Sequence, residues 1–425
     1  MPDLGPSPLV TGDELPVDDA RAAIAAVLRP ITASQPLPLA QALDRVLAHD
    51  IVSPIDVPAH DNSAMDGYAL RGEDLAADGG PSSLQPLEVT VFAGTPFGGR
   101  VEPGQCVRIM TGAVMPAGLD TVVPIELCRV ADGAVRIAAG TLRAGENRRR
   151  RGEDLARGSV ALAQGQRLRP ADLGLAASLG LDSLPVLRPL RVALFSTGDE
   201  LRDPGQPLDA GCIYDSNRAS LRGALQRLGV EVIDLGLVAD DPARLRATLD
   251  QAIEQADAVV TSGGVSVGDA DHTRDLLAAR GEVAFWKVAM RPGRPFAFGP
   301  LFRADGGTAW LFALPGNPVA ALVTFYVFVR EALLTLAGAD GMAPPPRLRA
   351  RSVAAIRKRP GRTEFQRALA QRTADGGWSV QLTGAQGAGI LRSMSQANAL
   401  VVLGHDQGPV AAGDEVEVWL FDGLV

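Results

Sequence analysis

The spacing of apolar and polar residues changes several times along the chain, and each change predicts a different kind of structure. Residues 18–28 repeat apolar positions at helical intervals behind two aspartates, which predicts a helix with an acidic first turn. Residues 50–145 contain short alternating runs broken by glycine and proline, a pattern typical of small β structure. The first 16 residues are rich in proline and glycine, and they predict a loose tail.

From residue 190 onward, continuous apolar runs alternate with helical stretches. Strands of this composition are buried on both faces, and their alternation with helices predicts a mostly parallel sheet. The sequence APPP at 343–346 predicts a stiff break, and the runs beyond it predict a small β-barrel. The expected barrel strands are 348–356, 364–370, 378–382, 399–403 and 415–420. The fold class is therefore multidomain, with one α/β unit and separate β units.

Composition and charge narrow the classes of function. The 425 residues are 46% apolar and 21% charged, which is typical of a globular protein. The net charge of −8 argues against a nucleic-acid partner, because such a partner requires a basic face. Three cysteines without a CxxC pair argue against a structural zinc site and suit a reducing compartment. The start lacks a leader pattern, and the longest apolar stretch, 319–329, is short for a bilayer. We therefore expect a soluble, cytoplasmic protein without a membrane partner.

Three polar loops follow strands of the α/β unit. They are FSTGDEL at 195–201, TSGGVSVGDAD at 261–271 and LPGNPVA at 314–320. Ligands of such sheets bind beyond the carboxyl ends of the strands. Gly263 and Gly264 permit close backbone approach and Ser266 supplies a hydroxyl, which suits a phosphate. Asn317 is a helix cap before Pro318, so a helix N-terminus would face an anion. A single such loop is equally explained as a sharp turn, but three together favour a binding site.

Acidic side chains crowd the same edge of the sheet. They are Asp199, Glu200, Asp240, Asp241, Asp269 and Asp271. Two unit charges about 4 Å apart repel by roughly 4 kcal/mol at an effective dielectric near 20, so an anionic substrate requires an offsetting charge. A divalent cation that prefers oxygen ligands, such as Mg2+, supplies it. One of Asp240 and Asp241 has the alternative explanation of capping a helix that begins at Pro242.

Cationic side chains follow in the segment FWKVAMRPGRPFAFG. Lys287, Arg291 and Arg294 lie there, and the RPGR turn spaces its two guanidinium groups around a proline. Guanidinium groups match phosphate and tetrahedral oxyanions in shape and charge. The alternative is a solvated surface turn.

Two further segments lie outside the α/β unit. HDNSAMDGY contains Asp61, and RIMTG places Thr111 in a turn after a strand. The basic run 148–151 precedes Asp154, and it is equally explained as a solvated loop. Each of these signals is weak by itself.

Taken together, these motifs resemble the MoeA family, which includes the E domain of gephyrin. The matching segments are DVPAHDNSAMDGYA, VRIMTGAVMP, RRRGEDL, FSTGDEL, IYDSNR, TSGGVSVGDADHT, FWKVAMRPGRPFAFG, LPGNPVA and EFQRA. They occur in this order between residue 56 and about residue 400 and cover nearly the whole chain. The chain departs from the usual family pattern by arginine for lysine at Arg291 and Arg294, and by alanine for serine at Ala320 and Ala388.

The resemblance implies four domains. These are an elongated N-terminal domain from residues 1–50 plus 150–187, an inserted β domain at 51–149, a molybdopterin-binding α/β domain at 188–341, and a C-terminal β-barrel at 342–425. It also implies a homodimer, in which the α/β domain of one subunit meets the inserted domain of the other at the active site.

The resemblance also implies a reaction, the insertion of molybdate into adenylyl-molybdopterin with release of AMP, and the residues that serve it. The catalytic positions by motif match are Asp61, Thr111, Asp154, Glu200, Asp240, Asp271 and Lys287. The substrate-binding positions are Gly263, Gly264, Ser266, Arg291, Arg294, Pro315, Gly316, Asn317, Arg367 and Ser393. Our hypothesis assigns Mg2+ to Asp240 and Asp271, molybdate to the three arginines, and the pterin phosphate to the glycine loop and the helix at Pro318.

Two alternative functions remain at this stage. The same α/β unit serves pterin adenylylation in related proteins, and gephyrin also acts as a non-catalytic scaffold. The extra domains favour insertion over adenylylation, and the carboxylates favour an enzyme over a scaffold. The expected partners are the two substrates, a second copy of the chain, a pterin adenylyltransferase and molybdoenzyme apoproteins.

Overall fold

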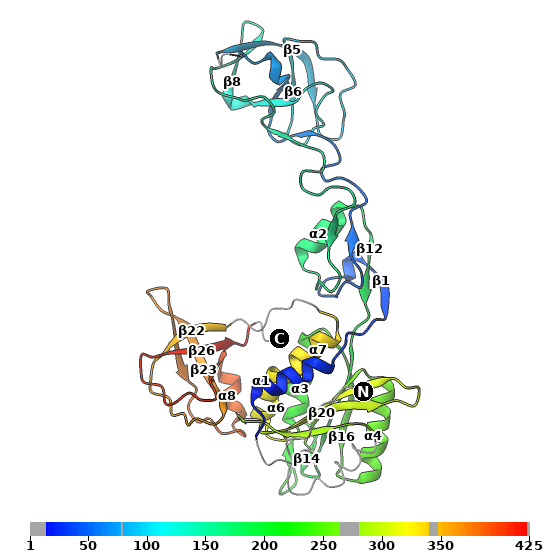
Figure 1. The fold of residues 1–425 in the computed structure, drawn as a ribbon, viewed down its shortest axis with the longest axis vertical. Coiled ribbons are helices and arrows are strands. Elements are labelled where there is room, and N and C mark those ends of the chain that lie inside the picture. The colour runs from blue at the N-terminus through cyan, green and yellow to red at the C-terminus, as the bar shows by residue number, and fades with distance from the viewer. Residues whose placement is uncertain (1–13, 78–79, 264–279, 340–346, 423–425) are drawn as a thin grey trace.

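The computed structural model describes residues 14–77, 80–263, 280–339 and 347–422, and the molecule is elongated (Figure 1). A small β domain lies at one end, and an α/β domain and a β-barrel lie side by side at the other. A narrow middle part joins the two ends. The chain enters the distal β domain and returns from it through this middle part, so two segments distant in sequence run together there.

The middle part is built from short paired strands and one helix. β1 (Ser34–Pro38) pairs antiparallel with β12 (Ser183–Leu187), and β2 (Ile51–Val52) pairs with β11 (Val160–Leu162). Helix α2 (Pro170–Ser178) packs on them and completes a small core. The pairing of β1 with β12 joins segments about 150 residues apart, which hydrophobic periodicity alone cannot predict.

The distal domain is a six-stranded sheet in the order β7–β4–β6–β5–β9–β8. Its strands are β4 (Gly67–Leu70), β5 (Ser82–Val91), β6 (Gln105–Ile109), β7 (Thr121–Pro124), β8 (Cys128–Ala131) and β9 (Ala134–Ile137). At its base, β3 (Asn62–Ser63) pairs with β10 (Arg148–Arg149). The prediction of small β structure between residues 50 and 145 is confirmed, and the start of the basic run lies in a strand instead of a free loop.

The α/β domain centres on a six-stranded sheet in the order β16–β13–β17–β21–β20–β18. The strands are β13 (Arg191–Thr197), β16 (Glu231–Val238), β17 (Ala258–Ser262), β18 (Ala284–Lys287), β20 (Pro295–Phe302) and β21 (Thr308–Leu314). The first three and β21 run parallel, whereas β18 and β20 are antiparallel. The sheet is therefore mostly parallel, as expected, with an antiparallel pair at one edge.

Helices cover both faces of this sheet. Helix α4 (Pro242–Gln255) packs on one face. The other face is covered by α1 (Val17–Val27), α3 (Ser216–Arg227) and a long helix from Pro318 to Leu336. That helix consists of α6 (Pro318–Thr324), a π-helical turn (Phe325–Val329) and α7 (Arg330–Leu336).

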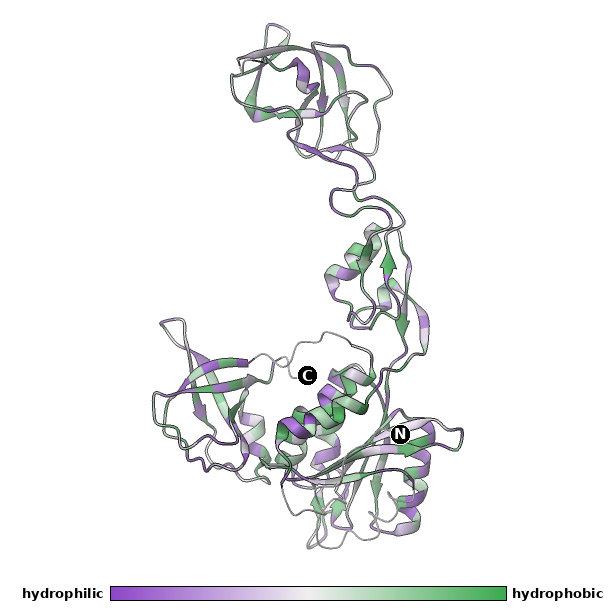
Figure 2. Cartoon of the chain, in the orientation of Figure 1, coloured by the Kyte–Doolittle hydropathy of each residue, from purple (hydrophilic) through white to green (hydrophobic). Residues whose placement is uncertain are grey.

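The helix from Pro318 to Leu336 is long and apolar enough to cross a membrane by composition, but 83% of its apolar window is buried inside the molecule. Its apolar residues and those of the sheet beneath appear green in Figure 2. Burial of this kind identifies it as the core helix of the α/β domain.

The C-terminal strands close into a barrel in the order β23–β24–β22–β26–β25, with β25 pairing back to β23. They are β22 (Arg347–Ser352), β23 (Thr363–Arg372), β24 (Trp378–Leu382), β25 (Ala399–Leu403) and β26 (Glu415–Leu420). The predicted barrel is confirmed. Helix α8 (Leu391–Gln396), which the pattern did not predict, lies between the barrel and α6.

The expectation of a loose tail through residue 16 is wrong for its last residues. The backbone of Leu15 donates to the carbonyl of Lys287 over 2.8 Å and accepts from the amide of Ala289 over 2.7 Å. Glu14 forms ion pairs with Arg294 and Arg362. Residues 14–16 therefore lie against the α/β domain because of long-range contacts that local composition does not encode.

Candidate active site

The carboxyl ends of three adjacent parallel strands meet at one edge of the α/β sheet. β13 ends at Thr197, β17 at Ser262 and β21 at Leu314, and these strands are neighbours in the sheet. The amide of Gly263 donates to the carbonyl of Leu314 over 3.1 Å. A Cβ on Gly263 would lie 2.5 Å from the carbonyl oxygen of Thr197, and its φ is +95°, so only glycine fits there. The polar loops that the sequence placed at strand ends therefore start side by side.

Two buried hydroxyl groups lie at this edge. The Ser196 and Thr197 hydroxyls are buried and have no hydrogen-bond partner among the described residues. Buried polar groups are normally paired, so orphaned ones favour the binding of a polar ligand or water nearby. This observation suits a phosphate-bearing ligand at the strand ends.

Asn217 at the start of α3 joins two of these strand ends, and sequence reasoning missed it. Its side-chain amide donates to the Ser262 hydroxyl and to the Gly316 carbonyl, each over 2.7 Å. The Asp215 carboxylate caps α3 by accepting from the backbone amide of Arg218. The signal was present as the segment IYDSNR, but an asparagine after a strand is common as a turn residue.

Three carboxylates lie close together beyond β13 and β16. The amide of Asp240 donates to the Asp199 carboxylate over 3.0 Å. Burial, followed by the negative charges of Asp199 and Glu200, raises the pKa of Asp240 above its ordinary value. The adjacent Asp241 caps α4 by accepting from the amide of Arg244. The open question between the two aspartates is thus answered: Asp241 is the cap, and Asp240 faces the other acids.

Asp199, Glu200 and Asp240 offer carboxylate oxygens, the ligands that Mg2+ prefers, but these three residues alone do not form a complete metal site. No group of three His, Cys, Asp or Glu side chains in the described parts of the chain has metal-binding geometry. The second predicted ligand, Asp271, lies outside the described residues, as do Gly264, Ser266 and Asp269.

Arg367 of β23 is the most buried of the predicted cationic residues. It is 1% exposed, and its guanidinium donates to the Ser393 hydroxyl over 2.9 Å and to the Gly387 carbonyl over 3.0 Å. Burial and the nearby charge of Arg291 lower the pKa of Arg367 to about 10. Arg291 is exposed and has no side-chain partner among the described residues. The structure therefore places Arg291 close enough to Arg367 for their charges to interact, and Arg367 contacts Ser393.

The start of the core helix lies beside the loop that contacts Arg367, where the α/β domain meets the barrel. The amide of Val319 donates to the Ala388 carbonyl over 3.0 Å, which joins LPGNPVA to the loop that contacts Arg367. Asn317 is the N-cap residue with Pro318 at the first helical position, but its side chain makes no capping hydrogen bond. The predicted position of Asn317 is right, and the predicted capping bond is absent. Pro315 is buried, and Gly316 is exposed.

Lys287 and Arg294 differ in whether their charges are paired. Lys287 ends β18 and is half-buried without a side-chain partner among the described residues. Arg294 is paired with Glu14, with 2.5 Å between Nη2 and Oε1. Of the three predicted cations in FWKVAMRPGRPFAFG, Arg294 is the one whose charge is already neutralised.

The remaining predicted residues lie in or beside the distal β domain. Asp61 accepts from the backbone amide of Arg151 over 2.8 Å and lies 3.5 Å from the Arg148 guanidinium. The Thr111 hydroxyl and amide both donate to the Asp66 carboxylate over 2.7 Å. Asp154 is exposed. Within one chain, the distal domain and the α/β domain lie at opposite ends (Figure 1), so these three residues do not reach the strand-end site.

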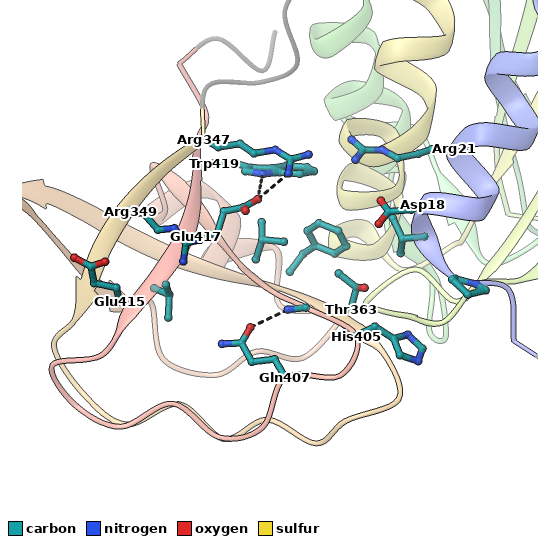
Figure 3. Close-up of a pocket in the computed structure, with 16 residues that line it drawn as sticks. Asp18, Arg21, Arg347, Arg349, Thr363, His405, Gln407, Glu415, Glu417 and Trp419 are labelled. Atoms are coloured by element: carbon teal, nitrogen blue, oxygen red, sulfur yellow. Dashed lines mark hydrogen bonds and ion pairs between the residues drawn. The ribbon is translucent and has the colours of Figure 1, made fainter.

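A separate cavity of about 350 Å3 lies between α1 and the barrel (Figure 3). The guanidinium carbons of Arg21 and Arg347 lie 5.4 and 5.6 Å from the centre of the Trp419 ring. Asp18 and His405 also line this cavity. None of the predicted site residues does, so this cavity is distinct from the strand-end site.

Known protein families match most of the chain. Residues 15–180 match the MoeA N-terminal region (domain I and II), residues 193–335 match the probable molybdopterin binding domain, and residues 349–421 match the MoeA C-terminal region (domain IV). The chain is 41% identical over 415 residues to molybdopterin molybdenumtransferase of Haemophilus influenzae, covering 97% of this chain and 100% of that protein.

Other relatives give the same result. Molybdopterin molybdenumtransferase 2 of Mycobacterium tuberculosis is 40% identical and covers 92% of this chain and 95% of its own length. The crystal structure of molybdopterin biosynthesis moeA protein from Pyrococcus horikoshii OT3 superposes with a TM-score of 0.81 at 27% identity, covering 96% of this chain and all of that one. The fold is that of a multidomain enzyme whose α/β domain matches the probable molybdopterin binding domain. The chain belongs to the MoeA family, as its motifs predicted.

Proposed function

We propose that this protein is a molybdopterin molybdenumtransferase, which inserts molybdate into adenylyl-molybdopterin and releases AMP. The observation that carries the proposal is the pair of arginines at the corner between the α/β domain and the barrel. Arg291 is unpaired within the described residues, and Arg367 is buried next to it. Two neighbouring guanidinium groups repel each other, and a tetrahedral oxyanion between them turns that repulsion into attraction.

The strand ends suit the other substrate. The Gly263 backbone offers polar groups to a pterin phosphate, and so do the hydroxyls of Ser196 and Thr197, which have no partner among the described residues. Asn217 keeps two strand ends at a fixed separation, so these groups are ordered before the ligand arrives. The pterin phosphate and molybdate would thus occupy neighbouring parts of one edge.

The carboxylates Glu200 and Asp240, together with Asp271, would hold Mg2+ near the phosphoanhydride. When bound, Mg2+ neutralises phosphate oxygens and makes the anhydride easier to cleave. Without it, the negative charges of Asp199, Glu200 and Asp240 would repel an anionic substrate. Lys287 adds a positive charge at the end of β18.

The distal residues Asp61, Thr111 and Asp154 are proposed to act on the site of a second copy of the chain. They cannot reach the strand ends of their own chain, which lie at the other end of the molecule. A homodimer in which each distal domain covers the partner's site would bring both sets together. We also propose action in the cytoplasm, with a pterin adenylyltransferase upstream and molybdoenzyme apoproteins downstream.

A molybdate-dependent AMP-release assay tests this function. The purified chain is incubated with adenylylated pterin and Mg2+, with and without molybdate, and AMP is measured. We expect release only when molybdate is present. Equal release without molybdate would contradict insertion. Transfer of AMP from ATP to free molybdopterin would favour adenylylation, and neither activity would favour a scaffold.

A further inference from the structure

The two arginines of the RPGR turn have different surroundings, although their spacing suggests one shared role. Arg291 approaches Arg367 and has no side-chain partner among the described residues. Arg294 pairs with Glu14, which also receives two hydrogen bonds from Arg362, over 2.7 and 2.8 Å. Glu14 therefore joins the turn in the α/β domain to the residue that precedes β23 of the barrel.

Backbone hydrogen bonds hold the residue after Glu14 in place. Leu15 exchanges hydrogen bonds with Lys287 and Ala289, just before the turn. The amide of Thr363 donates to the Ala289 carbonyl over 2.9 Å. The chain before α1, the turn and β23 thus form one continuous hydrogen-bonded junction, with the Glu14 carboxylate at its edge.

This junction determines where the oxyanion-binding arginines lie. β19 (Met290–Arg291) pairs parallel with β23, so that Arg291 lies opposite Glu364. Arg367 follows on the same strand, three residues beyond Glu364. A shift of the turn relative to β23 would change the separation of Arg291 and Arg367, and a bidentate site tolerates little change of this kind.

Positive charge collects at this junction, because Arg291 and Arg294 lie in the turn, Arg362 directly precedes β23 and Arg367 lies in it. Repulsion among these guanidinium groups opposes close contact of the turn with β23, and Glu364 offsets part of it. The described contacts of the bridge place one carboxylate, Glu14, between two of these cations. The Arg362 guanidinium holds the pKa of Glu14 below its usual value, and Arg294 adds to the effect. Exposed ion pairs contribute little, but Glu14 is only 19% exposed and its pairing with Arg362 is bidentate.

We propose that Glu14 is a positioning residue for molybdate binding: by bridging Arg294 and Arg362, it holds the RPGR turn against β23 so that Arg291 and Arg367 face one oxyanion. Arg294 then serves the bridge and does not bind molybdate. This inference rests on the proposed function, and it replaces the sequence-based assignment of molybdate to all three arginines.

Glu14→Gln and Arg362→Gln are the test variants, and Asp19→Asn is the matched control. Asp19 lies five residues from Glu14, is exposed, and has no side-chain partner among the described residues, so its substitution makes the same change of charge without touching the bridge. In the AMP-release assay, each bridge variant is expected to raise the KM for molybdate about fivefold to tenfold, with kcat and the KM for adenylylated pterin changed less than about twofold. The double variant should have a KM for molybdate no higher than that of either single variant. Glu14→Asp keeps the carboxylate, so its KM should lie between those of the wild type and Glu14→Gln.

An unchanged KM for molybdate in folded bridge variants would overturn the proposal. A lowered KM would also overturn it, since it would mean that Glu14 withholds Arg294 from the oxyanion. Direct titration with molybdate or tungstate separates this inference from the function. If the wild type binds the oxyanion but releases no AMP, the proposed function fails. The positioning role is still supported in that case if Glu14→Gln binds the oxyanion more weakly than the wild type and the control do. Equal binding by the variant, the control and the wild type contradicts it.

Discussion

Replacing Arg367 by alanine is expected to lower molybdate-dependent AMP release by about 10²–10³-fold, the usual cost of removing one donor to an oxyanion. Arg367 is 1% exposed, so water cannot easily take the place of its guanidinium. Burial and Arg291 lower its pKa to about 10, which leaves it charged at neutral pH but poorly stabilised. A bound oxyanion would offset both penalties, and this is why the loss should be large.

The measurement is the KM for molybdate together with a calorimetric titration of molybdate. Arg372→Ala is the matched control, because Arg372 ends the same strand at an exposed position. Arg367→Lys keeps the charge but loses the fork that contacts Ser393 and Gly387, and an intermediate loss is expected. Molybdate binding of wild-type strength by a folded Arg367→Ala variant would show that the oxyanion binds elsewhere.

Replacing Asp240 by asparagine is expected to reduce AMP release about 100-fold at a fixed Mg2+ concentration, because a metal ion contributes several kcal/mol to charge stabilisation. The carboxylate of Asp240 lies near Asp199 and Glu200, and burial with their charges raises its pKa. The variant should also need more Mg2+ for half-maximal release. The same change removes repulsion from the empty carboxylate cluster, so the free protein should be at least as stable as the wild type.

Asp241→Asn is the control for this prediction. It is the adjacent residue and undergoes the same change of charge, but its side chain caps α4. Asparagine caps helices about as well as aspartate, so stability should be kept. AMP release and the Mg2+ requirement of Asp241→Asn should match the wild type. If both variants lose activity equally, the activity depends on the total negative charge of this region, and the prediction of a specific role for Asp240 is wrong.

Sequence patterns predicted the parts of the fold that depend on local spacing. The apolar runs located β13, β17 and β21, and their parallel order followed from the intervening helices. The loops after these strands could then be placed at one edge, and Arg367 and Ser393 were expected near them from motif matches. Periodicity located no partner for β1, because its partner β12 is distant in sequence and both strands are short.

Long-range polar contacts were the main feature that the sequence did not predict. Glu14 belongs to a segment rich in proline and glycine, and its pairing with Arg362 spans 348 residues. The amide of Asn217 joins Ser262 and Gly316, which belong to two other loops. Such contacts depend on the finished topology. The choice between Asp240 and Asp241 as the helix cap likewise required the backbone geometry at the start of α4.

We expect one active site to combine the strand ends of one subunit with the distal domain of another. Asp61→Asn and Asp240→Asn chains carrying different tags are co-expressed, and the heterodimer is purified. Each variant alone is expected to be nearly inactive. In the heterodimer one of the two sites has both residues intact, so about half of the wild-type AMP release is expected. A heterodimer as inactive as its parents, or a chain that is fully active as a monomer, would contradict the shared site.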